Sequence, residues 1–293
     1  MHDETRSCEK GSGETGSGEP VPVKRVLVIG NSHSGAVKLG WDQQPREDVR
    51  LTFLVAPQRT FRHMRLDSQQ NWGLTEDLPA PELARHHEIL AELNSRTKAA
   101  LHDYDDVVLV GWPSGTDELA ALALTCQLEE HITTSPRDTL LSRQTCRALL
   151  ENLAQDLRPP REFWNIDGPR LHLIPRPTLA ETAVGSGYWA YRNIRKLNQQ
   201  QDTMSHWVAE LDEVRRHDLG SIGISYVAQP GATRGPFGLT TSSYLLPDAG
   251  YLDPKAPKAR GDHIHMNADY GQLCLGALWS ALKLPKDHPL VMA

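Results

Sequence analysis

The sequence lacks both long hydrophobic runs and an excess of positive charge. No apolar run approaches the roughly eighteen residues that a membrane span needs, and the acidic, Gly/Ser-rich start of the chain is unlike a signal peptide. Lys and Arg number 31 against 37 Asp and Glu, with no basic stripe interleaved with aromatic residues. We therefore expect a soluble, cytoplasmic protein that binds neither membranes nor nucleic acid.

Cysteine is also scarce. The four cysteines are Cys8, Cys126, Cys146 and Cys274, and none forms a C-x-x-C pair. This spacing argues against a zinc knuckle and against a disulfide framework, so we expect reduced thiols.

Residues 1–22 contain almost no side chains that a core could bury. They carry five acidic and two basic residues among glycines and serines, which predicts a disordered acidic tail. The rest of the chain, 23–293, shows no repeat and no linker between two cores. With 39% hydrophobic residues overall, it is long enough for one sizeable domain.

Short apolar, β-branched runs alternate with helical patterns along this domain. The runs predict strands at 24–30, 49–56, 106–111, 170–175 and 221–228. Helical spacing is found over 81–101, over the stripe 204–211 and over 267–282. Alternation of this kind predicts an α/β protein: a three-layer α/β/α sandwich with a five-stranded parallel, flavodoxin-like sheet.

Two further segments have a predicted structure. Ser135 to Asp138 reads as a capping box with a proline at the first helical position, so we expect the helix through Cys146 and Leu157 to begin there. The segment 229–261 is rich in Gly and Pro and precedes the last helix. Its length is typical of a functional loop, so we expect an active-site loop.

The stretch "VIGNSHSGA" places Ser32 directly after the first predicted strand. At the carboxyl edge of a parallel sheet such a serine is either a nucleophile or a helix cap. The distant stretch "ARGDHIHMNADYG" contains Asp262 and His265, just before the final helix. A nucleophilic serine needs a base, and the base needs a group that fixes its tautomer, so these three residues could form a triad.

This pair of motifs resembles the SGNH (GDSL-like) hydrolases. The turn "VIGNSHSGA" is most similar to the G-D-S-H subset, which includes sugar-ester hydrolases and acyltransferase-associated domains, and the likeness covers about residues 24 to 285. The resemblance implies that Ser32 is the nucleophile, His265 the base and Asp262 the orienting acid.

The resemblance also implies donors for the oxyanion. These would be the backbone of Ser32, Gly73 in "QNWGL" and Gly111 in "VVLVGWPSG". The sequence departs from the family pattern at two positions: Pro113 stands where an asparagine donor is expected, and Asn31 replaces the usual aspartate. Loss of one oxyanion donor typically costs a factor of about 10² to 10³ in rate, which argues against efficient hydrolysis.

Several polar or aromatic residues near these motifs are candidates for substrate binding. They are Asn31, His33, Asn71, Trp112, Ser114 and Arg176. Asn71, Ser114 or His33 could replace the missing donor. Arg176, at the end of the fourth predicted strand, could bind a carboxylate or sulfate, the alternative being a solvated arginine.

No cofactor and no metal is expected. His263 and His265 form an H-x-H pair, but Asp262 beside them favours the triad over a metal site. The remaining histidines show no clustering in the sequence.

The sequence therefore favours a serine esterase that removes a small acyl group from a sugar or other small-molecule metabolite. An acyltransferase with the same triad is an alternative. A non-catalytic SGNH-like protein that binds its ligand is another, as is a flavodoxin-like protein whose turn cradles a phosphate, although no P-loop lysine is present.

Overall fold

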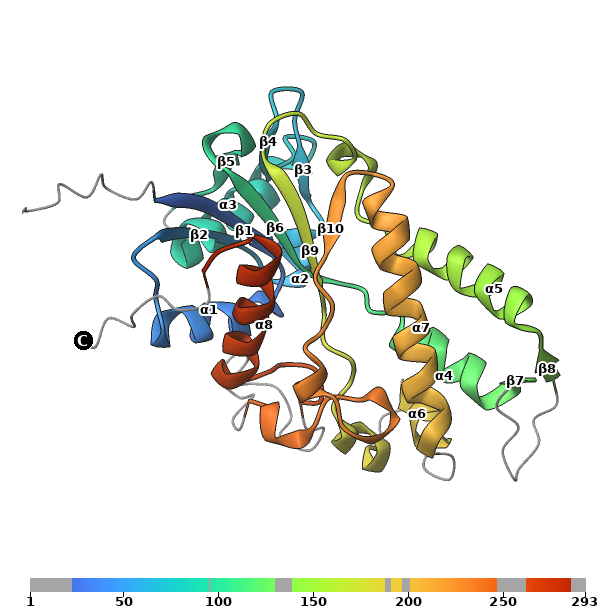
Figure 1. Cartoon of the computed structure of the whole chain (residues 1–293). Helices are drawn as coiled ribbons and strands as arrows, with labels where there is room; N and C mark the ends of the chain where they lie inside the picture. Colours follow the sequence, from blue (N-terminus) through green and yellow to red (C-terminus); the bar gives the residue numbers. More distant parts are fainter. Residues whose placement is uncertain are drawn as a thin grey trace, which may run out of the picture.

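The central sheet of the computed structural model contains the five strands that the sequence predicts. They are β1 (Lys24–Gly30), β2 (Val49–Val55), β6 (Asp106–Trp112), β9 (Arg170–Pro175) and β10 (Ile224–Tyr226). The strand order is β10-β9-β6-β1-β2, and every pairing is parallel (Figure 1). The predicted three-layer α/β/α sandwich with a flavodoxin-like sheet is confirmed.

The structure describes most of the chain from residue 23 onward. The described ranges are 23–94, 96–129, 139–187, 191–196, 201–246 and 262–285. The predicted acidic tail of residues 1–22 and the part of the predicted loop at 247–261 lie outside these ranges.

Successive residues of β1 point to opposite faces of the sheet, so alternate side chains of this strand belong to two different hydrophobic cores. Val26 and Val28 pack against α1 (Ser34–Gln43) and α8 (Ala268–Ala281). Leu27 and Ile29 belong to the core on the opposite face. Both sets are fully buried, as expected for a strand covered on both sides.

The helices α1 and α8 touch backbone to backbone. A Cβ atom on Gly271 would lie 1.8 Å from the carbonyl oxygen of Ala36, and one on Gly40 would lie 2.6 Å from the backbone nitrogen of Gln272. Only glycine permits this approach, which places the start of α8 beside α1 (Figure 1).

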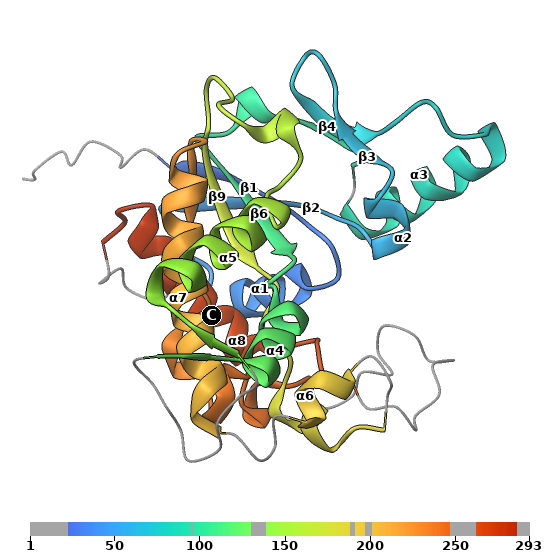
Figure 2. The same cartoon turned by 90° about the vertical axis from the view of Figure 1, so that its right-hand side faces the viewer.

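A small antiparallel unit follows β2 and covers part of the second face. It contains α2 (Gln58–Phe61), β3 (Met64–Leu66), β4 (Asn71–Leu74), α3 (Ala80–Asn94) and β5 (Lys98–Ala100), with the sheet order β3-β4-β5. Figure 2 shows this unit to one side of the main sheet. The helix predicted over 81–101 is thus shorter than expected, because its last residues pair with β4 as a strand.

A helical group packs at the other end of the sheet. Its elements are α4 (Thr116–Thr125), β7 (Cys126–Leu128), β8 (Thr139–Leu141), α5 (Arg143–Asp156), α6 (Arg192–Lys196) and α7 (Gln201–Gly220). The predicted stripe on α7 is confirmed as core, since Met204, Trp207, Val208 and Leu211 are all buried.

The predicted start of α5 is wrong. Ser135 to Asp138 lie outside the described residues, and the residues that follow form β8. The cap is Ser142, whose Oγ atom accepts a hydrogen bond of 3.2 Å from the backbone N–H of Thr145. Pairing of β8 with β7 prevents a helix from beginning earlier.

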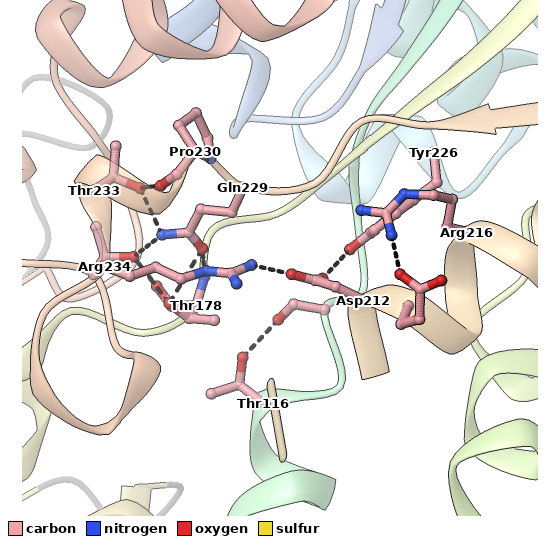
Figure 3. A network of polar contacts seen from close by, with 12 residues as sticks. Thr116, Thr178, Asp212, Arg216, Tyr226, Gln229, Pro230, Thr233 and Arg234 are labelled. Atoms are coloured by element: carbon pink, nitrogen blue, oxygen red, sulfur yellow. Dashed lines mark hydrogen bonds and ion pairs between the residues drawn. The ribbon is translucent and has the colours of Figure 1, made fainter. Parts of the chain in front are cut away.

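The described part of the long loop, 229–246, is folded. It contains the short 3-10 helices η6 (Gly231–Thr233), η7 (Pro236–Gly238) and η8 (Ser242–Tyr244). Earlier in the chain lie η1 (Leu101–Asp103), η2 (Arg161–Phe163) and η3 (Glu181–Gly185). Buried Gln229 holds the loop: its Oε1 accepts from the backbone N–H of Thr178 at 2.9 Å, and its Nε2 donates to Thr233 and Thr240 at 3.0 Å (Figure 3).

An ion pair ties the same loop to α7. Arg234 Nη2 lies 2.5 Å from Asp212 Oδ2, and the Tyr226 hydroxyl donates to Asp212 Oδ1 at 2.7 Å (Figure 3). All three side chains are mostly buried, so this loop is anchored to both the helix layer and the sheet.

None of the helices in the described ranges combines the length and the apolar character that crossing a membrane requires.

Candidate active site

Ser32, His265 and Asp262 form a continuous chain of hydrogen bonds. The Oγ atom of Ser32 lies 3.0 Å from Nε2 of His265, and Nδ1 of His265 lies 2.5 Å from Oδ2 of Asp262. The side chains of His265 and Asp262 are 18% and 13% exposed, so the site is reachable from solvent. The structure thus brings together the three residues that the sequence singles out.

The topology explains this meeting. Ser32 lies in the turn between β1 and α1, and Asp262 and His265 lie in the turn that leads into α8. Because α1 and α8 cross at Gly40 and Gly271, their two preceding turns come together at the carboxyl edge of the sheet.

Asp262 also shapes the turn in which it lies. Its Oδ1 atom accepts hydrogen bonds of 2.9 Å from the backbone N–H groups of Ile264 and His265. One carboxylate oxygen therefore holds the turn while the other holds the imidazole.

The folded part of the long loop supports the histidine from behind. The carbonyl of His265 accepts from the backbone N–H of Leu246 at 3.1 Å, and the N–H of Asn267 donates to the carbonyl of Tyr244 at 2.8 Å. The described part of the predicted active-site loop is thus a support for the triad turn.

Ser32 is not the cap of α1. The N-cap position is His33, whose side chain makes no capping hydrogen bond. The neighbouring hydroxyl, that of buried Ser34, donates to the carbonyl of Asn31 at 2.5 Å. Within the described chain, the hydrogen bond of the Ser32 hydroxyl is the one to His265, so the helix-cap alternative gains no support.

The protonation of the acid and of the neighbouring imidazole is set by their surroundings. Burial alone would raise the pKa of Asp262, but hydrogen bonds from His265 and Ile264 outweigh it and lower the pKa to about 2. Burial lowers the pKa of His33 to about 3, helped by the positive charges of His265 and Arg176. Asp262 is therefore charged and His33 neutral at neutral pH.

His33 lies against the triad histidine. The two imidazole rings are stacked, with centroids 5.3 Å apart and an interplanar angle of 25°. His33 thus fixes one face of His265.

Asn31 braces the turn that presents Ser32. Its Nδ2 atom donates to the carbonyl of Gly111 at 2.9 Å, and its Oδ1 accepts from the backbone N–H of His33 at 3.1 Å. Both polar ends are engaged inside the protein and the residue is 7% exposed, so Asn31 braces the turn from a position on the wall of the cavity described next. Gly111 has φ +86°, and a Cβ atom there would lie 2.3 Å from Asn31 Oδ1.

A cavity of about 310 Å³ opens beside this turn. Its near end is lined by Asn31, His33 and Gly111, the residues around Ser32. The other lining residues are the aromatic Phe61, Trp72 and Trp112, the arginines Arg62, Arg65 and Arg176, and Gln58, Met64, Pro113 and Pro160. No acidic side chain is found among these described lining residues.

Arg176 is the arginine that reaches the near end of the cavity. Its backbone N–H donates to the carbonyl of Trp112 at 2.7 Å, which fixes its position just after β9. In the described chain, its half-buried guanidinium has no hydrogen bond and no carboxylate within 4.0 Å. Its charge contributes to lowering the pKa of His33, so it lies close to the triad.

Three predicted site residues do not reach this cavity. Gly73 lies inside β4, opposite Arg65 on β3 and Lys98 on β5, so the antiparallel ladder holds it away from Ser32. The amide of Asn71 donates to both carboxylate oxygens of Asp67 at 3.0 Å.

Ser114, the third, lies 2.7 Å from the hydroxyl of Thr116 and lines a separate small recess. The structure therefore gives no support to the predicted roles of Gly73, Asn71 and Ser114 at this cavity. Trp112 and Arg176 do line it.

Sequence reasoning missed the wall of the cavity that comes from the small antiparallel unit. Phe61, Arg62, Met64 and Arg65 all lie in "QRTFRHMRLD", directly after the second strand. Three arginines close to Phe61 just after a strand end are a sequence signal that could have indicated this wall.

The H-x-H pair does not converge on one point. His265 binds Ser32 and Asp262, whereas Nδ1 of His263 lies 2.8 Å from the hydroxyl of Thr182. The two histidines thus serve different partners.

A scan against protein-family models finds no match to this chain, and a search of curated proteins finds none either.

Proposed function

We propose that the protein is a serine hydrolase that cleaves carboxylic esters, similar in its chemistry to the SGNH hydrolases. The observation that carries this proposal is the hydrogen-bonded chain Ser32–His265–Asp262, with distances of 3.0 and 2.5 Å. These are the contacts that an activated nucleophile requires.

The reaction divides into two steps. The Oγ atom of Ser32 attacks the ester carbonyl carbon while Nε2 of His265 takes its proton. His265 then gives that proton to the alkoxide as the C–O bond breaks, so the alcohol leaves and an acyl-serine remains. Water attacks the acyl-serine with the same base, releasing the acid and restoring Ser32.

Asp262 acts through His265. Its charged carboxylate accepts a hydrogen bond from the Nδ1–H group of His265, which leaves the lone pair of Nε2 directed at Ser32. The low pKa of Asp262 keeps its carboxylate charged at neutral and mildly acidic pH.

Gly111, the second predicted oxyanion donor that lies at this site, lines the cavity beside the turn. The backbone N–H of Ser32 is the other donor that we propose. It lies at the start of α1, where peptide dipoles favour negative charge. The side chain of Asn31 is occupied, and Pro113 has no N–H to donate. We therefore propose a slow esterase rather than a fast one.

The positive charge of the cavity lining favours a substrate that carries a negative charge. Arginine supplies the only charged side chains among its described lining residues, although the chain as a whole carries a net charge of −6. A free guanidinium beside aromatic rings suits an anion attached to an apolar group. We propose that the substrate is an ester that carries a carboxylate or a similar oxyanion on its acyl or alcohol part.

The test is labelling with a fluorophosphonate, followed by peptide mapping. We expect one adduct, on Ser32, that is lost in Ser32→Ala and in His265→Ala. The controls are Ser114→Ala and His263→Ala, which remove a similar side chain nearby and should label as wild type does. Folded wild-type protein that takes no adduct would contradict the proposal. Product analysis with and without added alcohols then separates hydrolysis from acyl transfer.

A further inference from the structure

His63, Glu82 and His86 form a cluster of metal-ligating side chains in the small antiparallel unit. His63 lies between α2 and β3, and Glu82 and His86 are one turn apart on α3. Each offers one ligand atom, and the three atoms lie within 4.8 Å of one another. None of the three lines the cavity beside Ser32, so the cluster is distinct from the ester site.

The spacing of these groups suits a shared zinc ion. The Oε1 atom of Glu82 lies 3.8 Å from Nε2 of His86, and the two imidazole centroids are 5.2 Å apart. Two imidazoles on one tetrahedral zinc have centroids about 5 Å apart, because each nitrogen lies about 2 Å from the metal. Two nitrogens and one carboxylate oxygen are a ligand set that zinc commonly takes.

Thr60 orients one of these ligands. Its hydroxyl is fully buried and lies 2.9 Å from Nδ1 of His86. With the Nδ1 proton donated to Thr60, the lone pair of His86 is on Nε2, the atom that faces Glu82. Metal-binding histidines are usually held by such a hydrogen bond on the second ring nitrogen.

The alternative to a metal site is an ion pair on the helix surface, and it explains less of this arrangement than a shared metal ion does. Such a pair would need only Glu82 and His86 at positions i and i+4. It gives no reason for a second imidazole, that of His63, to meet the same two groups.

We propose that His63, Glu82 and His86 bind one zinc ion, with a remaining position for water. The ion would tie the segment after α2 to the first turns of α3. Arg62 and Met64, the neighbours of His63, line the cavity, so the metal would hold that cavity wall in place from behind.

The experiment uses the full chain, freed of metal by dialysis against a chelator. Zinc chloride is titrated in competition with a chromophoric chelator, and Tm is measured with and without zinc. We expect one zinc bound at the cluster and a Tm that rises with zinc. His63→Ala and Glu82→Gln should each weaken this binding and remove the rise in Tm.

Two further variants separate a zinc site from adventitious binding. His102→Ala removes an exposed histidine whose Nε2 lies 3.7 Å from Asp103. No third ligand joins this pair among the residues that the structure describes, so the variant should bind zinc as wild type does. Thr60→Val leaves all three ligands in place, and loss of such a supporting hydrogen bond should weaken zinc binding about 10- to 100-fold. A wild-type chain that binds no stoichiometric zinc would overturn the proposal. So would His63→Ala and Glu82→Gln variants that bind zinc as tightly as wild type does.

Discussion

The Oγ atom of Ser32 lies 3.0 Å from Nε2 of His265, although 233 positions separate the two residues. Each lies in a turn that precedes a helix, and the two helices touch at Gly40 and Gly271. The contact therefore depends on the packing of whole elements, and a change in either side chain alters chemistry without removing the scaffold that brings them together.

The two partners of the nucleophile should differ in importance. If Ser32 is the nucleophile, His265→Ala removes its base, a loss that costs about 10⁶-fold in kcat in a serine hydrolase. Asp262→Asn keeps the shape but offers an amide to Nδ1, and a change of that kind costs about 10⁴-fold. Initial rates with saturating para-nitrophenyl acetate should rank the variants in this order. Equal rates for the two would contradict the roles assigned here.

His33 should make stability depend on pH. Its pKa is about 3 in the folded protein against 6.5 for a free imidazole, because burial and nearby positive charges oppose protonation. In the unfolded chain, His33 is thus protonated as the pH falls below 6.5. In the folded chain, His33 stays neutral until the pH approaches about 3. This contribution to stability is complete above pH 6.5 and is lost progressively as the pH falls.

Urea unfolding tests this effect. The free energy of unfolding of wild type should fall more steeply between pH 6.5 and about pH 4 than that of His33→Phe, which cannot take up the proton. Parallel curves for the two proteins would show that His33 titrates normally.

Much of the fold could be predicted because the five core strands are short apolar runs with no competing pattern. The start of α5 could not. The capping box at Ser135 satisfies local rules, but pairing of β8 with β7 decides where the helix begins. The predicted end of α3 was wrong for the same reason, since Lys98 to Ala100 form a strand that pairs with β4.

The triad was predictable because its chemistry needs three residue types, and the sequence places them in two turns at the carboxyl edge of the sheet. The position of Gly73, a predicted oxyanion donor, was not predictable. Gly73 was assigned by its order in the chain, whereas the antiparallel unit inserted after β2 carries it into a ladder. The histidine cluster was missed because His63 and His86 meet only through the packing of α2 and β3 on α3.

Gly111 should tolerate no side chain. Its φ of +86° is unfavourable for alanine, and the Cβ atom would displace Asn31 from the turn that holds Ser32. Gly111→Ala should lower the free energy of unfolding by about 1 to 3 kcal/mol and reduce esterase activity as well. Gly35→Ala is the control, because that position has an open surrounding within helix α1 and should retain stability and activity. Wild-type stability of Gly111→Ala would contradict the strain argument.

Arg176 should select substrates by charge. The probes are mono-para-nitrophenyl adipate, which ends in a carboxylate, and para-nitrophenyl heptanoate, a neutral ester of similar length. If the guanidinium of Arg176 binds the carboxylate, Arg176→Met should raise KM for the adipate about 10- to 100-fold. This is the loss of affinity expected when a hydrogen bond to a charged group is removed. KM for the heptanoate should change little, because methionine keeps the apolar stem.

The comparison of the two esters separates charge recognition from a general defect. A distorted cavity would impair both substrates, whereas loss of one cation should impair only the anionic one. Arg147→Met removes an exposed arginine that pairs with Glu151 on α5, and it should leave both KM values unchanged. Equal losses for adipate and heptanoate in Arg176→Met would show that this arginine shapes the cavity instead of binding an anion. Because the triad is intact in every variant, kcat for the heptanoate reports on Ser32 independently of the charge of the substrate.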